Sequence, residues 1–244
     1  MSANREQFGS RLGFILAAAG SAVGIGNLVG FPVNAAKNGG GAFLLIYAVF
    51  VVVLCLPVMM AELSLGRATK KDPLGAYKTV AGNSPWQFAG WLSLITPFMI
   101  AVFYTVLTVW LLGYLVNAAI GNLDQLAAPE TFGTFINGSS IFGYMIAVAL
   151  LIFAILASGV QEGIERAAKI LMPTLFIFLI GLVIFVLTLD NAWAGVAYYV
   201  VPDFDKITGS VVSGALSQAF FSLSLGMGIM ITYGSYMERK EDLP

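Results

Sequence analysis

The sequence predicts an all-α polytopic membrane protein whose first and last spanning segments are interrupted. The 244 residues are 59% hydrophobic and 10% charged, whereas a soluble domain carries about 25% charged residues. Mean hydropathy is +0.88. Six apolar stretches are long enough to cross a hydrocarbon core of roughly 30 Å. In two of them glycine and serine gather near the middle, where they would break a helix.

The six predicted spans belong to one transmembrane domain that covers residues 1–244. A signal peptide is the alternative interpretation of the first span, because Arg5 and Arg11 precede its apolar run and residues 21–23 resemble a cleavage site. The apolar run continues past that point, which favours a span. The spans are expected at about residues 12–37, 42–65, 88–120, 141–158, 169–189 and 211–236.

The first span begins as an apolar helix and is interrupted near its middle. Gly20, Gly24, Gly26 and Gly30 fall within eleven residues, and each glycine costs about 1 kcal/mol relative to alanine in a helix interior. In a bilayer, the backbone groups that a break frees must be satisfied by protein or water. This segment alone is compatible with a site for an ion or polar solute and equally with a kinked packing helix.

The second to fifth spans contain few polar side chains. An acid within a span, such as Glu62, is a candidate functional group, but we expect Glu62 to pair with loop groups at the membrane interface. Ile100 and Tyr104 share one face of the third span, and the tyrosine hydroxyl needs a hydrogen-bond partner there. We expect the charged turn at residues 161–166 to be a solvated face.

Lysine and arginine predict the orientation of the spans. Ten of the twelve basic residues lie on one side of the predicted membrane, and only Lys37 and Lys206 lie on the other. Because basic residues are enriched in cytoplasmic loops, both termini are predicted to be cytoplasmic. The basic loop at 66–84 is on that side, and its residues 74–80 are expected to form a short interfacial helix.

The sixth span repeats the interruption of the first. Gly226-Met227-Gly228 stands near its middle, as Gly24-Ile25-Gly26 does in the first span. Interrupted spans in corresponding positions are typical of transporters built from inverted repeats, with the binding site at the breaks. The pair therefore favours a transporter site over a packing kink.

Composition argues against several other functions. The net charge is −1 and the chain has no long basic cluster, so no nucleic-acid partner is expected. It has no histidine, which excludes histidine metal ligands and general bases, and its one cysteine, Cys55, cannot form an intrachain disulfide. No nucleophile–base pair is evident, and we do not expect an enzyme.

Motifs along the chain resemble those of the neurotransmitter:sodium symporters. The resemblance covers essentially the whole sequence and implies a LeuT-type fold, here its first five-helix repeat plus the sixth helix, with helices 1 and 6 unwound at mid-membrane. It also implies an integral plasma membrane protein, in bacteria of the inner membrane. The matching stretches are residues 11–16, 22–27, 31–32, 38–43, 62, 66–67, 163–166, 169–173 and 221–226.

The resemblance implies sodium-coupled import of a neutral, apolar amino acid or related amine by alternating access. The N–H groups of Ile25 and Gly26, at the start of a half-helix, would bind the substrate carboxylate together with the Tyr104 hydroxyl. Carbonyl groups at the breaks would accept from its ammonium group. The residues implied to bind substrate are Ala22, Gly24, Ile25, Gly26, Ile100, Tyr104, Phe221, Ser222, Ser224 and Met227.

Sodium is a hard cation that prefers oxygen ligands. The family's remaining sodium ligands come from helices that would lie beyond residue 244. Chloride is a further candidate ion, because Tyr47, Gln218 and Ser222 match chloride-site positions of the family. The residues implied to bind sodium are Gly20, Ala22, Val23, Asn27 and Ser222.

Two features depart from the family pattern. Gly30 stands where the family usually has an arginine that serves an external gate. The sequence also holds six of the family's ten core helices, so an incomplete transporter is expected. The alternative is a truncated, non-transporting membrane protein or a regulatory partner of a full-length transporter. The expected partners are a small amino acid or amine and membrane lipid, and a homodimer is compatible with the sequence.

Overall fold

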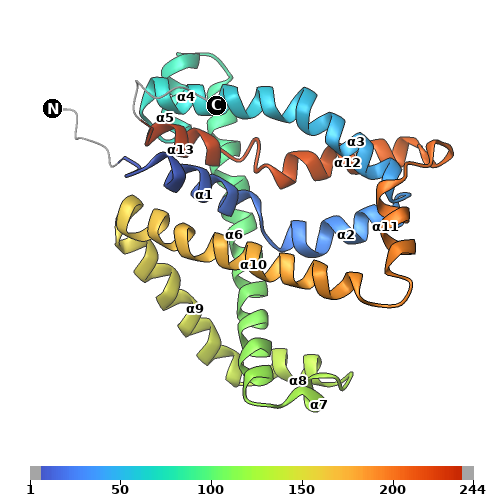
Figure 1. Ribbon diagram of the computed structural model, residues 1–244. Helices are drawn as coiled ribbons and strands as arrows, with labels where there is room; N and C mark the ends of the chain where they lie inside the picture. Colours follow the sequence, from blue (N-terminus) through green and yellow to red (C-terminus); the bar gives the residue numbers. More distant parts are fainter. Residues whose placement is uncertain (1–6, 238–244) are drawn as a thin grey trace.

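The computed structural model describes residues 7–237, and within them the chain is helical apart from turns and one isolated bridge between Gly40 and Pro202. Four α-helices and two short π-helical segments build the first two spans (Figure 1). The first span contains α1 (Arg11–Ala22), η1 (Gly26–Gly30) and α2 (Phe31–Lys37). The second is continuous and contains α3 (Gly41–Phe50), η2 (Val51–Cys55) and α4 (Leu56–Thr69).

The remaining elements follow in chain order. After α5 and the long α6, short helices connect α6 to α9 and α10 to α12. The bounds are α5 Pro73–Ala81, α6 Gln87–Ala119, α7 Leu123–Leu126, α8 Thr131–Asn137, α9 Ser140–Ala157, η3 Val160–Glu165, α10 Arg166–Leu187, α11 Ala192–Val200, η4 Phe204–Lys206, α12 Gly209–Ser222 and α13 Ile229–Ser235.

By length and hydropathy, four helices in the described residues are able to cross a membrane: Gly41–Thr69, Gln87–Ala119, Ser140–Ala157 and Val160–Leu187. The fifth expected span thus begins at Val160, because η3 continues directly into α10. The first expected span is a pair of helices, Arg11–Ala22 and Gly26–Lys37, bent by 57° at a short break. The sixth is also divided, since residues 223–228 separate α12 from α13.

The two divided helices lie side by side and run in opposite directions (Figure 1). The first half-helix, α1, contacts α13, and η1 contacts α12. The second span supports this pair along its length, with α3 against α12 and α4 against α13. This antiparallel arrangement brings the two breaks together.

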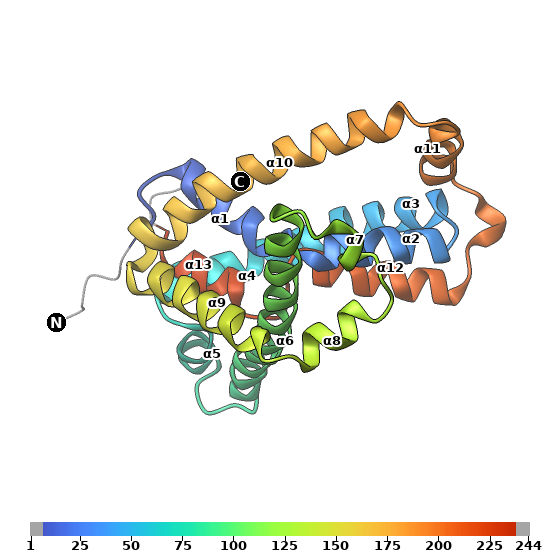
Figure 2. The ribbon, with the colours of Figure 1, turned by 90° about the horizontal axis from the view of Figure 1, so that it is seen from below.

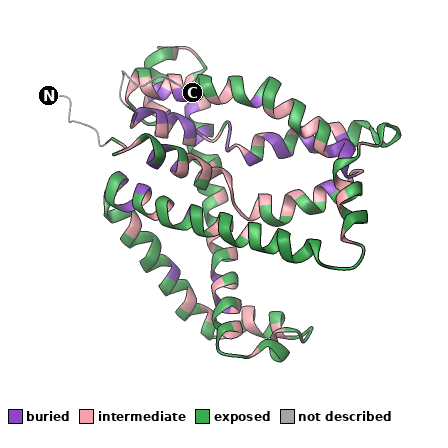
Figure 3. Ribbon diagram, in the orientation of Figure 1, coloured by how far each residue is buried: buried purple, intermediate pink, exposed green. Residues whose placement is uncertain are grey.

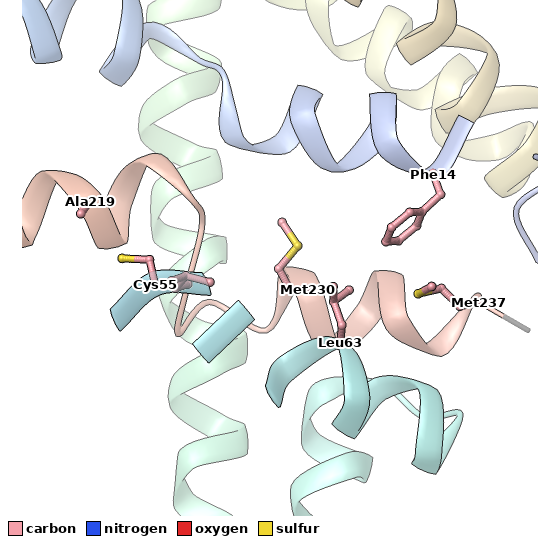
Figure 4. Packing of buried hydrophobic residues seen from close by; sticks show 7 residues of the cluster. Phe14, Cys55, Leu63, Ala219, Met230 and Met237 are labelled. Atoms are coloured by element: carbon pink, nitrogen blue, oxygen red, sulfur yellow. The ribbon is translucent and has the colours of Figure 1, made fainter. Parts of the chain in front are cut away.

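Small residues allow α4 and α13 to approach closely. A Cβ atom on Gly66 would collide with the Ile231 carbonyl, and one on Gly234 would collide with the Leu63 carbonyl. Small residues serve the same purpose between many membrane helices. The main apolar cluster lies around this contact and is drawn in Figure 4; its buried members are Phe14, Cys55, Leu63, Ala219, Leu225, Met230 and Met237.

Burial is unevenly distributed over the structure. Buried residues concentrate in α1, α3, α4, α12 and α13, whereas α9 and α10 are exposed along most of their length (Figure 3). The view in Figure 2 shows α10 passing along one side of the divided helices. The exposed side chains of α9 and α10 are mostly apolar, as expected for helices that contact lipid or other membrane helices.

The turn at residues 161–166 is only partly solvated, which corrects our expectation. Glu162 and Arg166 form an exposed ion pair at 3.6 Å. Glu165, however, is 2% exposed and accepts hydrogen bonds from Gly9 N at 2.7 Å and Ser10 Oγ at 2.8 Å. The turn is part of the continuous helix η3–α10, so one of its faces packs against the start of α1.

Candidate functional site

The two helix breaks are joined directly by side chains. Ser224, in the break after α12, donates from Oγ to the Ser21 carbonyl in the last turn of α1 at 2.9 Å. Its backbone has a φ of 54°, a left-handed conformation that is uncommon for residues other than glycine. The sixth-span break is therefore folded tightly against the first-span break.

A polar network centred on Asn27 connects the two breaks. Asn27 Nδ2 donates to the Ala22 carbonyl at 2.6 Å, and Asn27 Oδ1 accepts from Ser222 Oγ at 2.7 Å. Gln218 Nε2 donates to Ser222 Oγ at 3.2 Å, and Asn34 Nδ2 donates to Gln218 Oε1 at 3.0 Å. Oxygen atoms of Ala22, Asn27 and Ser222 are thus gathered at one point.

A cavity of about 770 Å³ adjoins this network. Its walls come from both breaks, from the middle of α6 and from α13. The predicted site residues that line it are Gly20, Ala22, Val23, Gly24, Asn27, Ile100, Tyr104, Phe221, Ser224 and Met227.

A second cavity, of about 560 Å³, lies between η1 and α6 and is lined almost entirely by apolar groups. Predicted residues Ile25 and Gly26 are in its wall. Ile100, Tyr104 and Phe221 line both cavities, so these three side chains form the partition between them. Gly30 also lines the second cavity, and a Cβ atom there would meet nothing within 4 Å.

The backbone of the first break lies directly against the aromatic partition. A Cβ atom on Gly26 would collide with the Phe221 ring and lie 3.2 Å from Tyr104 Oη. A Cβ atom on Gly24 would lie 3.3 Å from the Tyr104 ring. Glycine at position 26 therefore lets the Phe221 ring and the Tyr104 hydroxyl reach the start of the second half-helix.

Among the residues implied to bind substrate or sodium, Ser222 alone lines neither cavity. Its side chain is 4% exposed and is enclosed by its contacts with Asn27 and Gln218. Sequence reasoning also missed several wall residues of the larger cavity. These are Ser21, Pro97, Ala101, Leu156, Ile229, Thr232 and Tyr233.

Glu62 has a different partner from the one we expected. It is 7% exposed, and its Oε1 accepts from the Gly226 N–H in the sixth-span break at 2.7 Å. Ser93 Oγ of α6 donates to the carbonyl of the same glycine at 3.3 Å. The expected pairing at the membrane interface is wrong, because close packing of α13 on α4 places the break over Glu62. Glu62 and Ser93 together fix the backbone of the break at Gly226.

Two divided helices that meet at a cluster of oxygen atoms beside a partly apolar cavity are typical of secondary transporters built from inverted repeats. The chain belongs to the sodium:neurotransmitter symporter family, whose sequence model matches residues 5–134 and 136–244. The family consists of transporters, so its members are not enzymes.

Curated relatives agree with this assignment. The uncharacterised sodium-dependent transporter YhdH of Bacillus subtilis is 38% identical over 98% of this chain and 54% of its own length. Similar proteins of Haemophilus influenzae and Methanocaldococcus jannaschii are 35% and 38% identical, over 55% and 51% of their lengths. The chain therefore spans about half the length of the curated relatives it matches.

A solved structure has the same fold. The crystal structure of MhsT in complex with L-phenylalanine superposes with a TM-score of 0.84 at 43% sequence identity. The match covers 96% of this chain and 54% of the MhsT chain. The chain accordingly has the LeuT-type transporter fold of an integral membrane protein.

Proposed function

We propose that this chain provides the substrate and sodium site of a symporter that imports a neutral, apolar amino acid or related amine by alternating access. One observation carries the proposal: the oxygen cluster at Ala22, Asn27 and Ser222 lies beside a cavity with apolar walls. The family supports sodium coupling. Because the relatives are about twice as long, transport by these 244 residues is itself part of the proposal.

The oxygen cluster suits sodium as the co-transported ion. Its ligands would be the Ala22 carbonyl, the Asn27 side-chain oxygen and the Ser222 hydroxyl, which already lie within hydrogen-bonding distance of Asn27. All are uncharged oxygen donors, the kind of ligand that hard cations prefer. Sodium would replace the hydrogen bonds between these groups. The carbonyls of Gly20 and Val23, in the cavity wall, would serve a second ion.

The cavity suits a zwitterion with an apolar side chain. The substrate carboxylate would lie at the start of η1, near the N–H groups of Ile25 and Gly26, where the helix dipole favours an anion. Tyr104 Oη, next to Gly26, would donate to it. The ammonium group would face the carbonyls of Ala22 and Phe221. The substrate's side chain would contact Ile100, Phe221 and Met227. The L-phenylalanine bound to MhsT supports an apolar substrate.

The proposal includes an orientation and a location. Both termini are cytoplasmic, and the membrane is the plasma membrane, in bacteria the inner one. The asymmetry of basic residues supports this orientation. Chloride would use Tyr47, Gln218 and Ser222, of which Gln218 and Ser222 are hydrogen-bonded at 3.2 Å.

Ligand binding to the purified chain tests the proposal. We expect radiolabelled phenylalanine or leucine to bind in sodium buffer and to be released in potassium buffer, whereas glutamate and lysine should not compete. Uptake into vesicles with an imposed sodium gradient then distinguishes transport from binding. Binding without uptake would support the non-transporting alternative. Binding that is equal in sodium and potassium would contradict the proposed ion site.

A further inference from the structure

Asn34 belongs to the polar network but has no part in the proposed substrate and sodium sites. It lies on α2, about two helical turns after Asn27, and its Nδ2 donates to Gln218 Oε1 on α12 at 3.0 Å. Gln218 is 6% exposed. A buried amide directs its carbonyl oxygen and its NH₂ group to different partners. The partner of the Gln218 oxygen therefore decides where the Gln218 nitrogen points.

Two backbone carbonyls fix the direction of the hydrogen bonds in this network. The group of Asn27 that lies 2.6 Å from the Ala22 carbonyl is its NH₂ group, because a carbonyl oxygen only accepts. Its Oδ1 is then left to accept from the sixth span. In the same way, the Gly26 carbonyl lies 3.4 Å from Gln218 Nε2. The Gln218 oxygen consequently faces the other way, where Asn34 donates to it.

Gln218 Nε2 contacts both side-chain oxygens that are proposed to bind sodium. It donates to Ser222 Oγ at 3.2 Å and to Asn27 Oδ1 at 3.4 Å. Each of these oxygens has a second lone pair, so both can bind a cation while Gln218 still donates to them. If the amide were turned over, its oxygen would face the Gly26 carbonyl and Asn27 Oδ1, and the three oxygens would repel one another. The orientation of Gln218 thus keeps two ion ligands aimed at one point.

We propose that Asn34 is a positioning residue for the sodium site. Its N–H group fixes the orientation of the Gln218 amide, and Gln218 in turn holds Asn27 and Ser222 in the arrangement that binds the ion. The inference rests on the proposed function, because that function assigns sodium to the oxygen cluster. Asn34 lines neither of the two cavities at the breaks, so its loss should weaken sodium binding and leave the substrate pocket intact.

Asn34→Leu tests this role, because leucine keeps the branched shape of the side chain but has no donor. Binding of radiolabelled phenylalanine is measured across a sodium titration, with potassium keeping the ionic strength constant and with chloride fixed. Half-maximal binding should require roughly tenfold more sodium, the lower end of what the loss of an outer partner costs a metal site. Phenylalanine affinity at saturating sodium should not change. Asn34→Ala removes the same donor without adding an apolar branch and should give the same result.

A double-mutant cycle with Gln218→Leu separates positioning from a general structural effect. Because Asn34 acts through Gln218, Asn34→Leu should raise the sodium requirement of the unaltered chain and should add nothing in the Gln218→Leu background. The matched control is Asn38→Leu. The Asn38 amide donates to the Asn34 backbone carbonyl at 2.7 Å rather than to Gln218, so this variant should keep the sodium dependence of the unaltered chain.

Four results would overturn the role of Asn34. They are an unchanged sodium requirement in Asn34→Leu and Asn34→Ala, an equal effect of Asn34→Leu in both backgrounds, an equal effect of Asn38→Leu, and a loss of phenylalanine affinity that persists at saturating sodium. Each of them leaves the proposed function standing. Equal binding of phenylalanine to the unaltered chain in sodium and in potassium would instead overturn the proposed function and the role of Asn34 together.

Discussion

Glu165 links the start of the first helix to the fifth span through hydrogen bonds. Replacing it should lower the local stability of that helix start by an amount that follows from its contacts. Gly9 N and Ser10 Oγ donate to its carboxylate at 2.7 Å and 2.8 Å, and Ser10 in turn caps α1 by accepting from Gly13 N at 3.0 Å. Glu165→Gln keeps the shape of the side chain but removes the charge. It also turns an amide donor towards groups that are themselves donors.

The magnitude follows from these contacts. Hydrogen bonds to a charged group are worth about 1.5–3 kcal/mol each. Lys169 also contacts Glu165, at 2.6 Å, but the lysine side chain is 41% exposed, so solvent screens its contribution. Allowing for the bond that glutamine retains, we expect a loss of about 2–4 kcal/mol in the local stability of the α1 start. Each 1.4 kcal/mol changes an equilibrium constant tenfold, so the equilibrium constant for local opening should rise roughly 30- to 700-fold.

Hydrogen–deuterium exchange measures this opening directly. Amides of residues 9–14 should exchange faster in Glu165→Gln by that factor, while the amides of α6 should not change. The matched control is Glu162→Gln, three residues away in the same π-helical segment, where the acid forms an exposed ion pair with Arg166. Unchanged exchange in Glu165→Gln, or an equal change in Glu162→Gln, would refute the reasoning.

Three further predictions concern the site and the orientation. Gly26→Ala should displace the Phe221 ring, because the added Cβ atom collides with it. Substrate affinity in equilibrium binding should fall while the far-ultraviolet circular dichroism spectrum remains unchanged. An unaltered affinity would contradict the proposed partition. Tyr104→Phe removes a hydrogen-bond donor to the substrate carboxylate, so substrate binding should weaken by about 1 kcal/mol or more. This loss should persist at saturating sodium. Full recovery of substrate affinity at saturating sodium would contradict the role assigned to Tyr104. Single cysteines at residues 121–140 should react with an impermeant reagent added outside cells, and those at 68–72 should not; the reverse pattern would refute the predicted orientation.

The helix breaks were predictable because their signal is local. Glycines in 20–30 and 226–228 weaken a helix wherever it lies in the fold, and the structure interrupts the helix at residues 23–25 and 223–228. The fold and family could be predicted from the same stretches through the resemblance. Asn27 and Ser222 were predicted to lie together in one site, and their side chains are 2.7 Å apart.

The partners of the buried acids could not be predicted, because they depend on contacts between distant segments. Glu62 meets Gly226 across 164 positions, and Glu165 meets Gly9 across 156. An acid near the end of a span has the same local sequence signal whether solvent or another backbone faces it. Only one sequence feature placed Asn34 in the polar network: it lies seven residues, about two helical turns, after Asn27. Its contact with Gln218 required the position of α12.

Substrate binding across a sodium titration, for the unaltered chain and for Asn27→Ala, tests the central claim most directly. Asn27 joins Ala22 and Ser222, so its removal should weaken sodium and substrate binding together through linkage. A typical coupling of ~1–3 kcal/mol predicts that half-maximal binding requires roughly 5- to 150-fold more sodium. Substrate affinity should also fall at any fixed, subsaturating sodium concentration. An unchanged sodium dependence in Asn27→Ala would contradict the account.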